Sequence, residues 1–148
     1  MTEAPAQHSA IVADVMRPPV TTVNQNDHVA AAAYLMKRAD ASALVILDPR
    51  TGMPAGIVTS TDIAHAVADG RDLNEARIHN LMTEHPVVID QATRIRDAAK
   101  TMTGGHFRHL PVVGDAGLIG MVDITDVCRV LLDIDLSAQS ASGTAPPQ

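Results

Sequence analysis

The chain repeats itself once along its length. A segment that begins near Met16 ends in Gly56-Ile57-Val58-Thr59-Ser60-Thr61-Asp62, and a segment that begins near Met82 ends in Gly120-Met121-Val122-Asp123-Ile124-Thr125-Asp126. The two methionines lie 66 positions apart and the two closing aspartates 64 positions apart. A repeat of this length predicts two supersecondary units that pack on each other, because neither unit can bury its apolar face alone.

Matching segments of the two halves predict the same order of elements: strand, helix, strand, strand, helix. Continuous apolar runs at 43–47 and 110–113 are typical of strands buried on both faces. Asp27 and Thr93 are predicted N-caps, and Gly104-Gly105 a left-handed C-terminal cap. The fold class is therefore α+β, with small sheets covered by helices. The other predicted strands are 20–23, 86–89, 56–58 and 118–122, and the predicted helices are 29–38, 61–68, 95–103 and 125–133.

The predicted domain boundaries follow from the repeat and from the small, polar segments at the two ends of the chain. Residues 10–69 form the first unit, and residues 70–136 form the second together with a linker. Residues 1–9 and 137–148 are small, polar and without periodicity, which predicts a flexible lead-in and a flexible tail.

Charge and residue usage argue against several classes of function. The formal net charge is −6, and the chain has one Phe, one Tyr and no Trp. Nucleic-acid binding needs clustered cations or stacking platforms, so it is not expected. No apolar run approaches the roughly 20 residues of a membrane span, and the first residues lack a signal pattern. With Cys128 as the single cysteine, we expect a soluble cytoplasmic protein, and we expect Cys128 to be a small buried hydrophobe.

Each unit resembles a CBS domain, the module named after cystathionine β-synthase. The resemblance rests on Asp14-Val15-Met16 and Asn80-Leu81-Met82, on Leu110-Pro111-Val112-Val113, and on the two closing motifs, and it covers about residues 11–136. It implies two β-α-β-β-α units packed about a pseudo-twofold axis, a stand-alone tandem CBS protein. It also implies that an adenosine-containing ligand binds in the cleft between the units.

The resemblance implies a set of ligand-binding residues. Asp62 and Asp126 would hold ribose hydroxyls, and Thr59, Thr61 and Thr125 would lie near the ribose or a phosphate. The early strands would line the base pocket through Thr21, Thr22, Val23, Val87 and Val88.

The chemistry of the closing motif fits this role. An ionised carboxylate only accepts hydrogen bonds, so one Asp can accept from both cis-hydroxyls of a ribose. Gly56 permits close approach of a ligand to the backbone, and the free N–H groups at the start of the following helix favour a phosphate. The spacing Thr59-x-x-Asp62 also fits a capping box at a helix start, which is compatible with ligand binding by the same residue.

The two closing motifs are not equivalent. Asp123 stands where the first unit has Thr59, and its charge would repel a phosphate. Arg108 and His109 in the second unit have uncharged counterparts in the first, and Arg108 offers a bidentate fork to phosphate oxygens. We expect Arg108 and His109 to project toward the central cleft. If only one cleft is occupied, we expect the ribose on Asp62. His106 and His109 have no evident third partner, so a metal site is not expected.

These observations predict a stand-alone regulatory module that senses AMP, ADP, ATP, S-adenosylmethionine or NAD, with no required cofactor and no enzymatic activity. The output would pass to an effector protein in trans or through self-association, and the resemblance implies a homodimer. The alternative is a dimerisation or scaffold module that needs no ligand, in which the motif residues are helix caps only.

Overall fold

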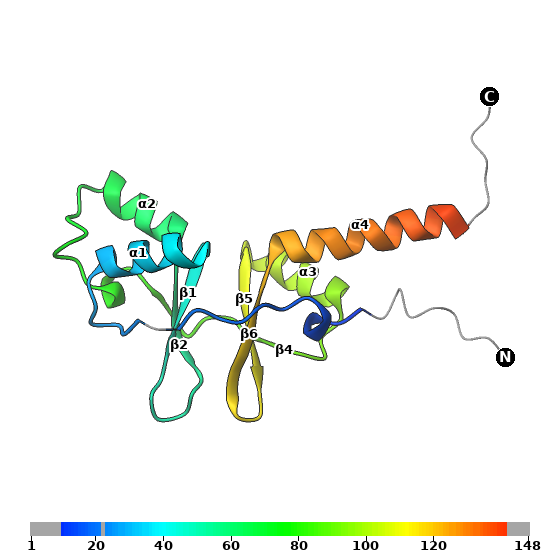
Figure 1. The fold of residues 1–148 in the computed structure, drawn as a ribbon, viewed down its shortest axis with the longest axis horizontal. Helices are drawn as coiled ribbons and strands as arrows, with labels where there is room; N and C mark the ends of the chain where they lie inside the picture. The colour runs from blue at the N-terminus through cyan, green and yellow to red at the C-terminus, as the bar shows by residue number, and fades with distance from the viewer. Residues whose placement is uncertain (1–9, 22, 142–148) are drawn as a thin grey trace.

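A computed structural model describes residues 10–21 and 23–141, with side chains described as far as residue 133. The predicted lead-in at 1–9, Thr22, and the predicted tail from residue 142 onward lie outside the described residues. The described chain confirms the α+β class, with four α-helices and two three-stranded sheets arranged as two repeated units. Figure 1 shows the two units side by side, each with its helices on one side of its sheet.

The first unit is built on an antiparallel sheet. Strand β1 (Ala43–Leu47) pairs with β2 (Pro54–Thr59), and β2 pairs with β3 (Thr83–Glu84). Helices α1 (Val29–Ala39) and α2 (Ser60–Ala68) cover this sheet (Figure 1). Helix α1 buries Val29, Ala32 and Met36, which share one helical face because they are spaced by three and four residues.

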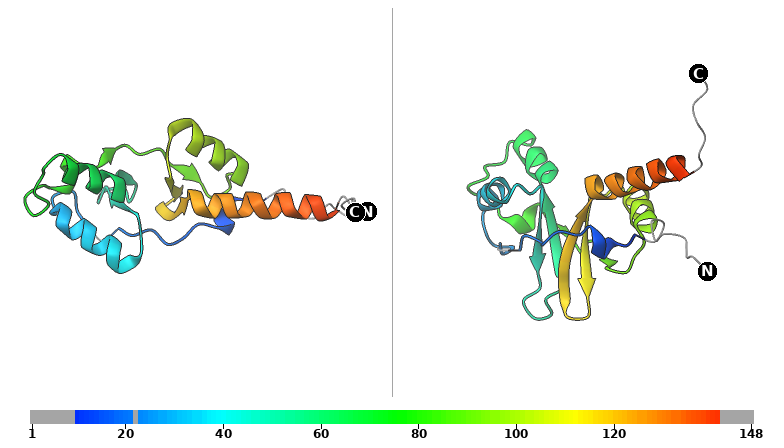
Figure 2. Two further views of the ribbon diagram at one scale, coloured as in Figure 1. Left: turned by 90° about the horizontal axis from the view of Figure 1, so that it is seen from above. Right: turned by 45° about the vertical axis from the view of Figure 1, so that its right-hand side comes forward.

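The second unit repeats the hairpin and the two helices, but its third strand lies on the other side of the hairpin. Strand β5 (His109–Gly114) pairs with β6 (Gly117–Asp123) in antiparallel fashion and with β4 (Ile89–Asp90) in parallel. Helices α3 (Ile95–Gly105) and α4 (Ile124–Ala141) cover the sheet. Helix α4 continues well beyond the sheet (Figure 2). Residues 137–141 are therefore helical, and the prediction of a flexible tail from residue 137 is wrong for these five residues.

The leading segment of each repeat joins the opposite unit. Strand β3 belongs to the second repeat but pairs with β2 of the first. In the same way Arg17 pairs with Met121, through backbone hydrogen bonds of 2.8 and 2.9 Å. Val12, in the short 3-10 helix η2 (Val12–Asp14), lies in the core of the second unit, and Ile78, in η3 (Ile78–Asn80), lies in the core of the first. Both side chains are fully buried. This exchange ties the two units together.

The glycines of the closing motifs make room for this exchange. A Cβ atom on Gly56 would lie 2.6 Å from Met82 Sδ, and one on Gly120 would lie 2.7 Å from Met16 Sδ. The close approach that Gly56 permits is therefore that of a side chain from the opposite unit. The repeated methionines that mark the sequence act as reciprocal contacts between the units, since thioethers adapt well to irregular gaps.

The predicted starts of α1 and α3, at Val29 and Ile95, are confirmed, but the three predicted caps are wrong. Helix α1 begins after His28 and α3 after Arg94, and neither residue makes a side-chain cap bond. Asp27 instead accepts a hydrogen bond of 2.8 Å from the Asn24 N–H, in the loop that precedes the helix. At the other end of α3, the left-handed residue is His106 (φ 58°), so Gly104 and Gly105 are the last helical residues. Asp40 (φ 50°) ends α1 in the same way.

The predicted first strands are shorter than expected. Over the described residues between 20 and 23 no strand forms, although the Val20 carbonyl accepts a hydrogen bond of 3.1 Å from the Val45 N–H. Of the predicted strand at 86–89, only Ile89 lies in a strand, β4. Pro19 and Pro86 stand at the start of these segments, and proline has no N–H to give to a ladder.

The tips of the two hairpins touch. The β1–β2 and β5–β6 hairpins run side by side in both views (Figures 1 and 2). The Leu118 N–H, beside the second turn, donates a hydrogen bond of 3.0 Å to the Gly52 carbonyl in the first turn. Gly117 lies against the same carbonyl, so this contact depends on the absence of a side chain at residue 117.

Candidate functional site

A cavity of about 350 Å³ lies between the two units. A cavity of roughly 300–1,000 Å³ suits a small-molecule ligand. The first unit contributes the end of β2 and the start of α2, and the second contributes the segment around β3 and the turn between α3 and β5. Its lining consists of Ile57, Thr59, Thr61, Asp62, Thr83, His85, Pro86, Val87, His106, Phe107, Arg108 and His109. We call this cavity the first cleft.

The polar corner of the first cleft is a capping box at the start of α2. The Thr59 N–H donates to Asp62 Oδ2 at 2.8 Å, and the Asp62 N–H donates to Thr59 Oγ1 at 3.2 Å. These two bonds fix the half-buried carboxylate. Within the described residues Asp62 Oδ1 receives no hydrogen bond. The same residue therefore caps the helix and still presents acceptor capacity to the cavity.

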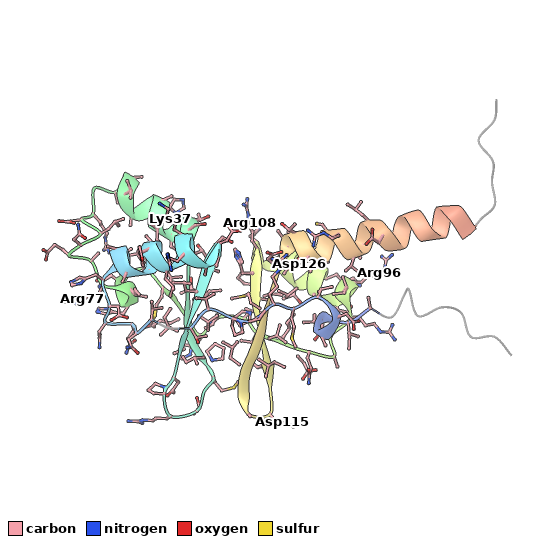
Figure 3. All side chains as sticks on the ribbon, viewed as in Figure 1. Lys37, Arg77, Arg96, Arg108, Asp115 and Asp126 are labelled. Atoms are coloured by element: carbon pink, nitrogen blue, oxygen red, sulfur yellow. The ribbon has the colours of Figure 1, made fainter. Side chains whose placement is uncertain are left out.

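The opposite side of the first cleft is basic. His106 and Arg108 come from the turn that leads into β5, and His85 comes from the chain that follows β3. Figure 3 shows Arg108 at the end of β5 that lies between the helices of the two units. The Arg108 side chain is exposed, and among the described residues it has no salt-bridge partner. A free guanidinium beside a cavity is suited to bind a phosphate or a carboxylate.

His109 lies between two cavities. It lines the first cleft, and its Nε2 is 2.7 Å from the Ser42 Oγ at the edge of a second cavity. Burial lowers the pKa of His109, Arg108 lowers it further, and Asp123 opposes both effects. His109 is therefore neutral at pH 7 and acts as a hydrogen-bonding group there.

The remaining wall of the first cleft is apolar. Ile57, Pro86, Val87 and Phe107 form it, and Val87 is 43% exposed although its side chain is large and apolar. The Phe107 ring lies over Gly105, where an added Cβ would overlap the ring. The absence of a side chain at residue 105 thus permits the observed position of the only phenylalanine in the chain. An aromatic ring and aliphatic neighbours provide a surface on which a planar base can stack.

The second cavity has a volume of about 270 Å³ and is related to the first by the repeat. Arg17, Pro18 and Val20 replace the segment around β3, Asp40 to Ala43 replace His106 to His109, and Asp123 replaces Thr59. We call this cavity the second cleft. Its closing aspartate, Asp126, is only 4% exposed and is not among the residues that line it.

Asp126 is bound by arginines. Arg17 Nε donates to Asp126 Oδ2 at 2.9 Å and Arg17 Nη2 donates to Oδ1 at 2.7 Å, which is a bidentate pair. Arg129 Nη1 adds a third contact of 3.2 Å to Oδ1. The hydrogen bond from Arg17 lowers the pKa of Asp126, against the opposing effect of burial. The carboxylate is therefore ionised and its acceptor oxygens are engaged inside the protein.

The structure brings six of the fourteen predicted site residues together in the first cleft. Thr59, Thr61, Asp62, Val87, Arg108 and His109 all line it. Asp123 lines the second cleft, together with His109. The expectation that Arg108 and His109 face the region between the units agrees with this placement.

The other predicted site residues lie elsewhere. Gly56 is buried under Met82, and Val23 belongs to the core of the first unit. Thr21, Val88, Thr125 and Asp126 line neither cleft. Gly56 and Val23 line neither cleft, because other protein groups cover these residues. Cys128 is exposed rather than buried.

Sequence reasoning missed six lining residues: Ile57, Thr83, His85, Pro86, His106 and Phe107. Three of them, Thr83, His85 and Pro86, reach the cleft through the exchange of leading segments. His85 has a positive φ of 50°, and its backbone N–H donates to the Ala55 carbonyl at 3.2 Å. The one signal in the sequence is that His85 and Pro86 lie three and four positions after the repeated Met82. Among the described residues no group of three or more His, Cys, Asp or Glu side chains is placed to hold a metal ion. None of the described helices has the length and hydropathy that a membrane span requires.

Comparison with known proteins consistently finds CBS domains. The family model for the CBS domain matches the chain twice, at residues 12–69 and 78–133. An uncharacterized 17.7 kDa protein of Acidianus ambivalens is 34% identical over 124 residues, which cover 83% of this chain and 74% of that protein. The mitochondrial CBS domain-containing protein CBSX3 of Arabidopsis thaliana is 32% identical over 111 residues, 72% of this chain but only 54% of CBSX3.

A solved structure shows the same fold. The CBS domain pair of protein MJ0100, determined in complex with 5′-methylthioadenosine and S-adenosyl-L-methionine, superimposes with a TM-score of 0.74 at 28% sequence identity. The match covers 84% of this chain and 97% of that one.

Proposed function

Because the chain belongs to the CBS-domain family, we propose that it is a regulatory module that binds an adenosine-containing ligand in the first cleft. The observation that carries this proposal is the meeting of three kinds of group in one cavity. These groups are a fixed carboxylate, a guanidinium with no salt-bridge partner in the described part of the chain, and an apolar wall with an aromatic ring. CBS domain pairs are generally regulatory modules, so the ligand would change the state of the protein rather than be turned over.

Each group has a defined partner in such a ligand. Asp62 accepts hydrogen bonds from the ribose hydroxyls, with the hydroxyls of Thr59 and Thr61 close by. Phe107, Pro86 and Val87 cover the base. Arg108 binds the anionic end, which is a phosphate in a nucleotide and a carboxylate in S-adenosylmethionine.

The comparisons support the adenosine part of this proposal. Both compounds in the MJ0100 structure contain adenosine, and they differ in charge and in what is attached to the ribose. If all such ligands use one adenosine subsite, the residues on the basic side of the cleft determine which of them binds most tightly: AMP, ADP, ATP, S-adenosylmethionine or NAD. Asp123, which would repel phosphates, lines the second cleft and so does not weigh against nucleotides in the first.

Output through self-association would use exposed apolar side chains on the helices. Tyr34 on α1 is 64% exposed, Val67 on α2 is 57% exposed, and Leu132 on α4 is 62% exposed. An effector protein acting in trans is the other route. Either route requires that the ligand bind one state of the protein more tightly than the other.

A thermal-shift panel tests the proposed function. We expect at least one of AMP, ADP, ATP, S-adenosylmethionine, 5′-methylthioadenosine and NAD to raise the unfolding temperature. A ligand at about 100 times its dissociation constant stabilises the folded chain by about 2.7 kcal/mol. For a domain of this size that corresponds to a rise of several degrees. The absence of any response would favour the ligand-independent scaffold, in which Asp62 serves only the capping box.

Replacement of Gly105 by alanine tests the role of Phe107 in the cleft. The added methyl group overlaps the Phe107 ring, so we expect the ring to move into the cavity. A bound ligand would have to push the ring back against residue 105, at an overpacking cost of about 1–3 kcal/mol, so the affinity for the responding ligand should fall about fivefold or more. Titration calorimetry measures the change.

Gly104→Ala is the matched control for this substitution. Residue 104 lies in the same last turn of α3, and an added Cβ meets nothing within 4 Å. Alanine in place of a helical glycine stabilises by about 0.5–1 kcal/mol in both variants. Equal ligand affinities for Gly104→Ala and Gly105→Ala would show that Phe107 does not shape the binding site.

A further inference from the structure

The two clefts differ most at one pair of matching positions. Arg17 follows Met16 and Thr83 follows Met82, so the two residues correspond in the repeat. Both cross to the opposite unit: Arg17 pairs with Met121 in β6, and Thr83 pairs with Ile57 in β2. Each backbone position therefore lies beside the closing motif of the other unit.

Arg17 is long enough to reach the closing aspartate of that motif. Its guanidinium contacts both carboxylate oxygens of Asp126, at 2.9 and 2.7 Å. A bidentate fork of this kind occupies the same in-plane acceptor sites that a pair of vicinal hydroxyls would need. Asp126 is 4% exposed and lies under Arg17, whose own side chain is 60% exposed.

Thr83 leaves the other aspartate open. Its side chain is short, uncharged and exposed, and it lines the first cleft. Within the described residues Asp62 has no salt-bridge partner, and Oδ1 receives no hydrogen bond. The same backbone exchange therefore gives one free carboxylate and one occupied carboxylate.

The charges near the second cleft also disfavour an anionic ligand there. Asp40 and Asp123 line it, and the guanidinium of Arg17 is paired with Asp126. His109, whose pKa is lowered by burial, adds no positive charge at pH 7. Among the described residues that line the second cleft, none therefore offers a phosphate a free cation, and two carboxylates would repel it.

We propose that Arg17 closes the second cleft by occupying Asp126, so that the chain binds one adenosine-containing ligand and a single substitution opens a second site. This inference rests on the proposed function. Arg17 thereby sets the stoichiometry of the module, and Thr83 is the residue whose small size keeps the first cleft open.

Exchange of the two residues tests the inference. 5′-Methylthioadenosine is the probe, because it carries adenosine without a phosphate that Asp123 would repel. Titration calorimetry should give one site for the wild-type chain, two for Arg17→Thr and none for Thr83→Arg, in which the new guanidinium reaches Asp62. Thr83 is exposed, so Thr83→Arg should fold, whereas Arg17→Thr is first checked by thermal unfolding.

The outcomes separate this inference from the proposed function. A wild-type chain that binds two molecules of the probe, or a folded Arg17→Thr that gains no site, overturns the inference alone. If Arg17→Thr does not fold, Thr83→Arg decides: binding at the wild-type affinity overturns the inference. If no compound of the thermal-shift panel stabilises the wild-type chain, the proposed function is overturned. In that case Arg17→Thr still tests whether Arg17 closes the second cleft, because a variant that gains a site for the probe would support the closure and one that gains none would contradict it.

Discussion

Replacement of Asp62 by alanine is expected to lower ligand affinity at least a hundredfold. The carboxylate would accept from two ribose hydroxyls, and hydrogen bonds to a charged group are worth about 1.5–3 kcal/mol each. The loss of two such bonds amounts to at least about 3 kcal/mol, which is roughly two powers of ten in the dissociation constant. Titration of the wild type and the variant with the ligand found in the thermal-shift panel measures this difference.

Asp126→Ala is the matched control for Asp62→Ala, since the two aspartates occupy the same position in the repeat. Its carboxylate is bound by Arg17, so its removal should leave ligand affinity unchanged while it reduces stability. Asp62→Ala also removes one of the two hydrogen bonds of the capping box, at a cost of about 1 kcal/mol of stability. Asp62→Asn keeps an acceptor for the Thr59 N–H, so it separates capping from ligand binding. An Asp62→Ala variant with wild-type affinity would contradict the ribose assignment.

Replacement of Gly117 by alanine is expected to cause the largest loss of stability among the glycine substitutions, about 3 kcal/mol or more. Two costs combine at this position. The backbone at Gly117 has a φ of +126°, which residues with a side chain rarely adopt. An added Cβ would also lie 2.6 Å from the Gly52 carbonyl oxygen. That oxygen belongs to the backbone of the neighbouring turn and accepts the hydrogen bond from Leu118, so it has little freedom to move. Urea denaturation gives the free energy of unfolding.

Gly70→Ala isolates the backbone part of this cost. Gly70 also has a positive φ, of +78°, but an added Cβ meets nothing within 4 Å. The left-handed conformation alone costs an L-residue about 1–2 kcal/mol. A Gly117→Ala variant no less stable than Gly70→Ala would show that the contact between the two hairpin tips does not contribute to stability.

Local patterns predicted most of the elements. The apolar run at residues 43–47 matches β1 residue for residue, because its flanking turn residues end it on both sides. Because the two units repeat, an element predicted in one unit was also predicted at the matching position of the other. The buried positions of α1 and α3 confirm this match, since they correspond at an offset of 66 residues. The helix caps were less predictable. Asp27 and Thr93 are good capping residues, but each lies one residue too early for the helix that forms.

The arrangement of the site depended on contacts that no local pattern records. The backbone exchange places Thr83 and His85 beside β2, and it places Arg17 on Asp126, 109 positions away in the chain. A carboxylate in a repeated motif indicates a possible ribose contact, but its availability depends on which side chain the opposite unit brings to it. The sequence alone showed that the two units differ at Asp123 and Arg108. It did not show the larger difference between the two clefts, which is that Arg17 binds the closing aspartate of one of them.

A crystal structure of the chain with the ligand that responds most strongly in the thermal-shift panel tests the central claim most directly. We predict density for one ligand per chain, with its ribose hydroxyls on Asp62, its base against Phe107 and its anionic end near Arg108. The pair of Arg17 and Asp126 should remain intact. A ribose bound to Asp126, or a ligand outside the first cleft, would contradict the account.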